Sequence, residues 1–414
     1  MSVPEPTTAG SSTEPDRPFG LARAGALIGP AITAANLLQY VLQLAASRLL
    51  SPSGFGGFGA LVGLGVIGAV PMLALQTVSA RHVALRRDDP AARTAEASRL
   101  LAAAVKLAAG LTAAGLLAAP LVAMFLHVPV AAAALLALSL GPLAVAGAAQ
   151  GVLQGRERFA ALATVFVLVS AGRVLGGAGA LLLSSSVTSG VAGLAAGTLA
   201  GAGVALLAVR RERAPKPYGA EPAGFRRELW QALSGVLALL ALGGADLLLA
   251  RHLHPGATSG RYAAGSLVAR GCFWAPQFVA VLVVPRVSSG QPGVLRRAVA
   301  VVAGLGVVEV LVGLLAPTAA IRLVFGPGYS SLVHVLALFA LAGALLAVLQ
   351  LLLQVGIAGG GSLVGRWAWS ALALEVAIAL TLRPGSLGLV CLAAACIAGA
   401  VAGSLVTVAR QHRS

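Results

Sequence analysis

The chain has 414 residues, of which 58% are hydrophobic and 10% charged, and its mean hydropathy is +0.92. This composition excludes an ordinary water-soluble enzyme, because soluble domains are about half apolar and about one quarter charged. It also excludes a disordered chain, because so much apolar surface must be buried. The net charge of +16 does not indicate nucleic-acid binding, since the basic residues lie in short connections between apolar segments and form no continuous patch.

Twelve apolar segments follow one another along the chain, each close to the roughly 20 residues that one membrane-spanning helix needs. They are residues 22–47, 55–80, 100–126, 129–152, 159–183, 187–209, 229–250, 259–285, 295–318, 331–356, 364–382 and 385–409. We therefore predict an all-α integral membrane protein with about twelve transmembrane helices.

The polar segments predict the domain organisation. Residues 1–20 are rich in Pro, Ser, Thr and Glu without a basic segment before an apolar one, which predicts a disordered cytoplasmic tail instead of a cleaved signal. The longest polar interruption, 210–228, contains three prolines and separates six segments from six. We expect an N-lobe at 21–209, a cytoplasmic linker at 210–228, a C-lobe at 229–409 and a cytoplasmic tail at 410–414.

The basic residues predict the orientation. With both ends in the cytoplasm, 21 of the 29 Lys and Arg residues lie on the inner side and five on the outer side, as the positive-inside rule requires. We expect a multi-pass protein of the cytoplasmic membrane with both termini inside, and Arg48 and Arg251 at the outer rim as anchors.

The two halves resemble each other at a nearly constant offset. The matching pairs are Arg48 and Arg251, Pro71 and Pro276, and Gln150 and Gln354, at offsets of 203, 205 and 204. Both copies begin on the same side, which predicts a parallel repeat about an axis along the membrane normal. The alternative is that helix ends reuse Arg and Pro without a repeat.

The eighth segment carries a polar face. Ser266, Arg270, Trp274 and Gln277 are spaced four, four and three residues apart, so they share one side of a helix. A guanidinium beside an indole and an amide suits an anionic, sugar-bearing ligand, because Arg binds phosphate through two donors and aromatic rings stack on sugars. The alternative is that Arg270 pairs with Asp246 or Glu309 and locks helices together.

The first segment carries a second polar face, formed by Thr33, Asn36, Tyr40, Gln43 and Ser47. It indicates a helix that lines a hydrated cavity, or one that hydrogen-bonds to neighbouring helices. At the repeat offset Gln43 corresponds to Asp246, which we therefore expect to face the same central space from the other lobe.

Four further charges lie within predicted helices, where each is costly unless paired or hydrated. Lys106 lies near the inner end of the third helix, and we expect it to extend to the headgroups. Arg173 is a candidate for the cavity, and Glu309 and Glu375 either bind a coupling cation or proton or pair with Arg. The three cysteines, Cys272, Cys391 and Cys396, are interpreted as packing residues. Neither a nucleotide-binding glycine loop nor a Cys pair at metal-ligand spacing occurs, and the pair His252 and His254 alone is a weak metal signal, so we expect no cofactor, no metal site and no catalytic residues.

Several segments resemble polysaccharide flippases of the multidrug/oligosaccharidyl-lipid/polysaccharide (MOP) superfamily. LAASRLLSPSGFGGFGAL (44–61) resembles the segment that joins their first two helices, and residues 245–288 resemble their second-lobe opening, with its acid (Asp246), its Gly-x-Tyr step (Gly260, Tyr262) and its Pro-Arg (Pro285, Arg286). VFGPGYSS (324–331) is similar to the family's F-G-x-x-Y, and GVLQGRERF (151–159) resembles its inner turn. The resemblance covers the chain after Phe19.

The resemblance implies a two-lobed transporter without an ATPase, which moves a lipid-linked oligosaccharide from the inner to the outer leaflet. It implies that the headgroup passes through a cationic cavity, which Arg270 and Arg173 match, while the lipid tail stays in the bilayer. It implies a lipid-linked glycan, the bilayer and glycan-assembly proteins as partners. Two alternatives stay open: a cation-coupled multidrug antiporter of the same superfamily that uses Asp246, Glu309 or Glu375, and a membrane-embedded glycan-assembly enzyme, against which the lack of acidic loop motifs counts.

Overall fold

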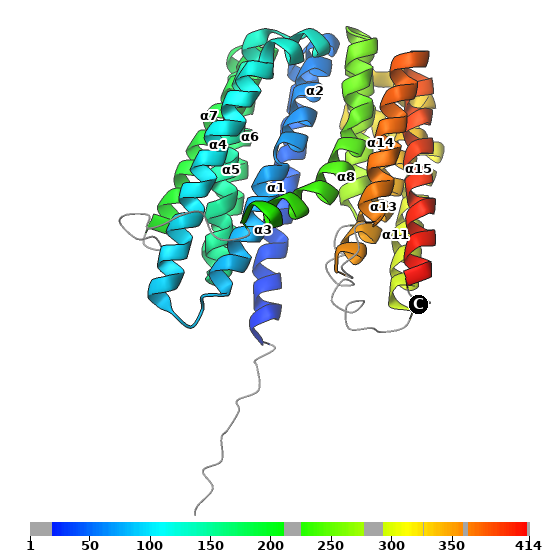
Figure 1. Cartoon of the computed structure of the whole chain (residues 1–414). Helices are drawn as coiled ribbons and strands as arrows, with labels where there is room; N and C mark the ends of the chain where they lie inside the picture. The colour runs from blue at the N-terminus through cyan, green and yellow to red at the C-terminus, as the bar shows by residue number, and fades with distance from the viewer. Residues whose placement is uncertain (1–18, 211–224, 277–292, 326, 359–362, 412–414) are drawn as a thin grey trace, which may run out of the picture.

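The computed structural model describes residues 19–210, 225–276, 293–325, 327–358 and 363–411, and every regular element in these ranges is a helix. Ten helical spans in these ranges are long and apolar enough to cross a membrane. Together with α1 and α9 they form two groups of six (Figure 1). The predicted all-α, two-lobed membrane fold is confirmed, whereas most of the predicted linker at 210–228 lies outside the described residues.

The N-lobe contains α1 (Phe19–Leu49), α2 (Pro52–Gly68), α3 (Val70–Ala84), α4 (Pro90–Leu126), α5 (Val130–Gly155), α6 (Phe159–Leu183) and α7 (Val187–Val209). α2 and α3 together make one span of 33 residues. The span is interrupted at Ala69, because Pro71 has no N–H to continue the hydrogen bonding of the preceding turn.

The C-lobe contains α8 (Phe225–Leu253), α9 (Ala257–Trp274), α11 (Val294–Leu315), α12 (Pro317–Val324), the 3₁₀ helix η2 (Pro327–His334), α13 (Leu336–Ala358), α14 (Leu363–Leu382) and α15 (Ser386–Gln411). Arg48 and Arg251 each lie in the last turn of a helix, α1 and α8, as the repeat predicts. α1 begins and α15 ends at the same end of the bundle (Figure 1). We call this the terminal end, and the opposite end the distal end.

Side-chain caps fix several helix starts. The Oγ atom of Ser51 accepts a hydrogen bond from Gly54 N and begins α2 with Pro52 in its first turn. Asp89 accepts hydrogen bonds from Ala91 N and Ala92 N at 3.0 and 2.9 Å and starts α4 ten residues before the predicted segment. The apolar pattern missed these ten residues because they form a polar extension of the helix.

Glycines let α6 and α7 approach until their backbones touch. A Cβ atom at Gly193 would strike the carbonyl of Gly176, and one at Gly197 would strike the carbonyl of Gly172. The four-residue spacing of these glycines on each helix allows this close approach. The contact buries Leu181 and Leu194 in the core that α1, α2 and α8 share.

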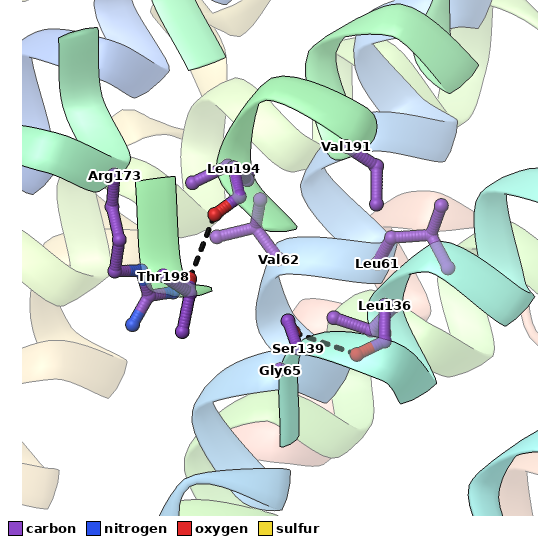
Figure 2. Close-up of a pocket in the computed structure, with 9 residues that line it drawn as sticks. All are labelled: Leu61, Val62, Gly65, Leu136, Ser139, Arg173, Val191, Leu194 and Thr198. Carbon is purple, nitrogen blue, oxygen red and sulfur yellow. Dashed lines mark hydrogen bonds between the residues drawn. The ribbon is translucent and has the colours of Figure 1, made fainter. Parts of the chain in front are cut away.

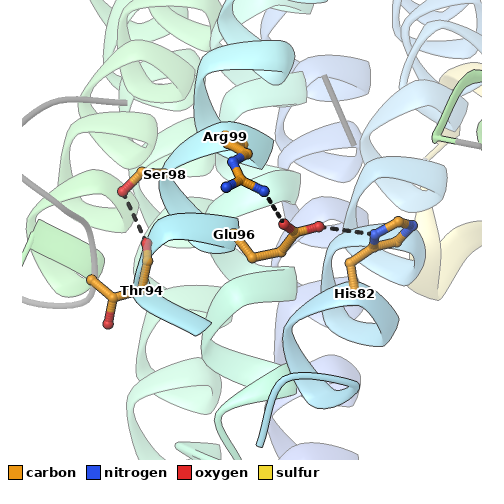
Figure 3. A network of polar contacts seen from close by, with 5 residues as sticks. All are labelled: His82, Thr94, Glu96, Ser98 and Arg99. Carbon is orange, nitrogen blue, oxygen red and sulfur yellow. Dashed lines mark hydrogen bonds and ion pairs between the residues drawn. The ribbon is translucent and has the colours of Figure 1, made fainter. Parts of the chain in front are cut away.

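A polar network joins α3 to α4 within the terminal half of the N-lobe (Figure 3). Glu96, only 4% exposed, binds His82 Nδ1 through Oε1 and accepts a hydrogen bond from Arg99 through Oε2, both at 3.1 Å. Burial of this carboxylate is tolerated because two partners hold it.

The lobes pack against each other mainly through α2 on α8 and α9, and through α3 on α8. Small residues make the approach possible: a Cβ atom at Gly56 would strike Ser259, and one at Gly59 would lie 3.1 Å from the Cβ of Ala263. This interface between α2, α8 and α9, which we call the lobe boundary, positions the candidate site.

Candidate functional site

The predicted polar face of α9 is present and turns toward the lobe boundary. Ser266 is buried and its hydroxyl has no hydrogen-bond partner among the described residues, whereas Trp274 is 40% exposed. The indole of Trp274 contacts the ring of Phe273 edge-on, at 5.0 Å between centroids. The fourth predicted member, Gln277, lies outside the described residues.

Arg270 extends from α9 to the backbone of the opposite lobe. A Cβ atom at Gly63 of α2 would lie 2.8 Å from Nη2 of Arg270 and 3.4 Å from Cδ2 of Leu247. The guanidinium therefore occupies the space that the missing side chain of Gly63 leaves open. This cation is partly buried at the contact between the lobes, where it can meet a ligand that lies between them.

Part of the predicted α1 stripe reaches the same boundary. The hydroxyl of Tyr40 lies 3.6 Å from the position of a Cβ atom at Gly271, the residue after Arg270. Asn36 and Gln43 are half-buried. At the two ends of the stripe, Thr33 and Ser47 donate hydrogen bonds to carbonyls of their own helix, Gly29 O and Leu44 O. Tyr40 is thus the stripe residue that contacts α9, while the roles predicted for Asn36 and Gln43 stay predictions.

Asp246 is buried within the C-lobe, where two donors hold its carboxylate. Oδ1 accepts from the backbone N of Leu247 at 2.7 Å, and Oδ2 accepts from the hydroxyl of Tyr262 at 3.0 Å. Its charge also interacts with those of Arg270 and Glu375. Asp246 is thus held by donors from α8 and α9, the two helices of the C-lobe that form the lobe boundary.

Glu375 of α14 is fully buried, and neither of its carboxylate oxygens has a hydrogen-bond partner among the described residues. Glu309 of α11 is half-buried, and its Oε2 atom has no hydrogen-bond partner among the described residues. Cys272 is buried. Glu375 and Glu309 both have carboxylate oxygens with open lone pairs, which can take up a proton or a cation.

Arg173 is separated from Arg270 by α2. It lines a pocket inside the N-lobe together with Val62, Gly65, Ser139 and Thr198 (Figure 2). The hydroxyls of Ser139 and Thr198 donate to Leu136 O and Leu194 O, and the Nε atom of Arg173 is buried without a partner among the described residues. Val62 and Gly65 face this pocket while Gly63 faces Arg270, so the two predicted cations lie on opposite sides of one helix.

The sequence-based interpretation missed two residues. Arg251, expected as an anchor at the membrane rim, is 6% exposed and bonds across the lobe boundary, so the anchoring role was wrong. Tyr262 was matched to the Gly-x-Tyr step without a role, although it donates to Asp246. A signal was present in the second case only: Tyr262 lies four residues before Ser266, so it extends the same polar face of α9.

Comparisons with known proteins agree with this architecture. A family model described as "Polysaccharide biosynthesis protein" matches residues 21–265. No curated protein matches the sequence. Among solved structures, the lipid II flippase MurJ in an inward closed conformation matches with a TM-score of 0.72, 12% identity, and coverage of 91% of this chain and 87% of that chain.

Two conformations of a multidrug resistance MATE family transporter of the MOP superfamily also match. The inward-facing one has a TM-score of 0.67 at 13% identity and covers 91% of this chain and 94% of that chain. The outward-facing one has a TM-score of 0.62 at 14% identity, with coverage of 94% and 95%. At these identities the likeness establishes the fold.

Proposed function

The chain belongs to the polysaccharide biosynthesis protein family, and on this premise we propose that it carries a lipid-linked oligosaccharide or polysaccharide precursor across the cytoplasmic membrane by alternating access of its two lobes. The observation that carries the proposal is Arg270, whose guanidinium lies between the lobes against Gly63. A cation at this position suits the diphosphate that links a glycan to its lipid carrier, because a guanidinium can donate two parallel hydrogen bonds to phosphate oxygens.

The surroundings of Arg270 support a sugar-bearing substrate. Tyr40 approaches from α1, and the partly exposed Trp274 lies one turn further along α9. Aromatic rings beside a guanidinium can stack on sugar faces while the cation binds the phosphate. Asn36, Gln43 and Gln277 are proposed to add hydrogen bonds to the glycan. Arg173, which lies within the N-lobe pocket, is proposed as a second cation that the substrate reaches when the lobes rearrange.

The acids of the C-lobe are proposed to couple transport to an ion. Asp246 and Glu375 interact with each other and Asp246 interacts with Arg270. A proton or cation bound by these acids therefore changes the charge that Arg270 faces. Glu309 is the third candidate for this role.

A cation-coupled multidrug antiporter is the second candidate function, and the observation that favours it is the same three C-lobe acids, of which Asp246 and Glu375 are buried and Glu309 is half-buried. An antiporter needs an acid that either a proton or a cationic drug can neutralise, and the C-lobe supplies three. The membrane-embedded enzyme is set aside, because the solved structures described above are transporters.

The test uses proteoliposomes with the purified protein and a fluorescently labelled polyprenyl-diphosphate oligosaccharide. Access of an external quencher to the label reports transfer between leaflets. We expect transfer in the wild type and its loss in Arg270→Ala. The matched control is Arg261→Ala, which removes an exposed arginine from the same helix. A labelled phospholipid without glycan controls for non-specific scrambling.

Two results would contradict the proposal. Transfer that proceeds equally well in Arg270→Ala would remove Arg270 from the substrate path. No transfer in the wild type, combined with extrusion of a cationic dye under a proton or sodium gradient, would favour the antiporter.

A further inference from the structure

One arginine of the C-lobe binds the backbone of the N-lobe at the distal end of the bundle. The Nε atom of Arg251 donates to Leu126 O at 2.7 Å, Nη2 donates to His127 O at 2.7 Å and Nη1 donates to Ser53 O at 3.2 Å. These three acceptors lie at the end of α4 and the start of α2. A fourth hydrogen bond, from Nη1 to Ser259 Oγ at 2.9 Å, ties the same guanidinium to α9 of its own lobe.

The acceptors explain how a cation can be buried here although no acid among the described residues pairs with it. All four are carbonyl or hydroxyl oxygens, and two of them are the last carbonyls of α4, where the helix dipole places partial negative charge. His127 ends α4 in the left-handed conformation, with φ of 51°, which ends the helix at these carbonyls. The guanidinium thereby donates hydrogen bonds to carbonyls at the end of α4 that have no donor within the helix.

Neutral partners make this contact easy to reverse. A guanidinium separated from a buried carboxylate leaves two uncompensated charges, whereas carbonyls released from Arg251 at a helix end can bind water again. When the lobes separate at this end, Arg251 is hydrated as well. Several hydrogen bonds therefore hold this contact when the lobes are closed. Opening it costs little free energy, because water replaces those bonds.

Two neighbouring contacts bind the lobes at the same end. The ring of His252 stacks on that of Phe125, with 4.0 Å between centroids and 5° between planes, and its Nδ1 lies 3.0 Å from Phe125 O. The hydroxyl of Tyr329 in η2 donates to Ser47 O of α1 at 3.1 Å. Each contact joins a C-lobe side chain to an N-lobe carbonyl.

We propose that Arg251 is the residue that closes the distal end between the lobes and that its release from Leu126, His127 and Ser53 is a required step of transport. Arg48, the repeat equivalent of Arg251, is exposed. We call the contact of Arg251 with Leu126, His127 and Ser53 the gate. The proposal rests on the proposed alternating-access transport, because a gate has a role only if this end opens.

The test reads the opening of the distal end without any substrate. Cys272, Cys391 and Cys396 are replaced by Ala, and a reporter cysteine is placed at Ser47, which is 5% exposed and lies beside the gate. A polar maleimide is then added to the protein in lipid nanodiscs, where both membrane faces are accessible. Arg251→Gln is compared with the unaltered gate and with Arg261→Ala, the exposed arginine of the same region.

We expect labelling of Ser47→Cys to be about tenfold or more faster in Arg251→Gln, since several cross-boundary hydrogen bonds are lost, and unchanged in Arg261→Ala. A second reporter, Ser79→Cys, is fully buried in α3 and separates gating from loss of the fold. Faster labelling at Ser47 but not at Ser79 supports the gate. Equal labelling at Ser47 in all variants, or faster labelling at both reporters in Arg251→Gln, would overturn it.

The labelling assay tests the gate and the transfer assay tests the proposed function, so the two proposals can fail independently. Wild-type protein that does not transfer a lipid-linked glycan would reject the substrate, while the labelling result would still establish whether Arg251 closes the distal end. In the transfer assay we expect Arg251→Gln to slow net transfer, because a distal end that stays open interrupts the cycle.

Discussion

The hydroxyl of Tyr262 on α9 donates a hydrogen bond to Oδ2 of Asp246 on α8, and both side chains are buried inside the C-lobe. The bond fixes the carboxylate on the helix that carries Arg270, whose charge interacts with it. The acid and the cation are therefore oriented by the same pair of helices.

Tyr262→Phe is expected to lower the free energy of unfolding by about 1–3 kcal/mol, since it leaves a buried carboxylate oxygen without its donor. The ring contact with Phe339, at 5.0 Å between centroids, is retained by Phe. Denaturation in detergent measures the change, and a double-mutant cycle with Asp246→Ala isolates the pair. Additive effects in that cycle would show that the hydrogen bond contributes nothing.

Gly63→Ala is expected to impair transfer of the labelled glycan about as strongly as Arg270→Ala. The new methyl group would lie 2.8 Å from Nη2 of Arg270 and would displace the guanidinium from the lobe boundary. Because the displaced group is the end of a flexible side chain, we expect the unfolding free energy to change by less than about 1 kcal/mol. Gly179→Ala, where a Cβ atom meets nothing within 4 Å, is the control. Normal transfer in Gly63→Ala would show that transfer of the glycan does not depend on the position of the Arg270 guanidinium.

Gly193→Ala is expected to destabilise the fold by about 2 kcal/mol or more, because the methyl group would strike the carbonyl of Gly176 and force α6 and α7 apart. Gly203→Ala on the same helix meets open space and should be neutral or slightly stabilising, since Ala favours a helix over Gly by about 1 kcal/mol. Thermal unfolding of both variants measures the difference. Equal melting temperatures would mean that the helices are less closely packed than described.

Glu96→Gln is expected to lower the unfolding free energy by about 1–3 kcal/mol. The neutral amide loses the charge-assisted bond from Arg99 and weakens the contact with His82. Asp88→Asn is the control, because its carboxylate is exposed and contacts only the exposed Arg87 at 3.8 Å, so its effect should stay within about 0.5 kcal/mol. Chemical denaturation of the two variants side by side measures the difference. Similarly small effects would show that the buried network contributes no more to the unfolding free energy than the exposed ion pair does.

The transmembrane helices could be predicted from the sequence, because a helix that spans the lipid needs a long apolar run. The predicted segments 159–183 and 187–209 coincide with α6 and α7, and the four-residue spacing of Ser266 and Arg270 correctly placed them on one face of α9. The close contacts between the glycines of α6 and α7 also have a sequence signal, because small residues recur there at helical spacing.

The contacts between the lobes could not be predicted in this way. Arg251 binds the backbone carbonyls of Leu126 and His127, and every residue carries such a carbonyl, so no side-chain pattern identifies its partners. Arg173 and Arg270 looked equivalent as charges within apolar segments, yet they lie on opposite sides of α2. Which face of a buried helix meets which neighbour depends on packing between distant segments.

Glu375→Gln is expected to leave the fold at least as stable as the wild type and to abolish the ion dependence of transfer. Its carboxyl group is fully buried with no hydrogen-bond partner among the described residues, so a neutral amide removes the free-energy cost of ionising a group at this position. Asp246→Asn is the matched comparison: it also removes a charge but disturbs the hydrogen bonds from Leu247 and Tyr262, so it should destabilise as well as uncouple. Transfer is measured with and without proton and sodium gradients, alongside thermal unfolding. If Glu375→Gln keeps the full ion dependence of the wild type, Glu375 is not the coupling acid, and Asp246 or Glu309 must carry that role.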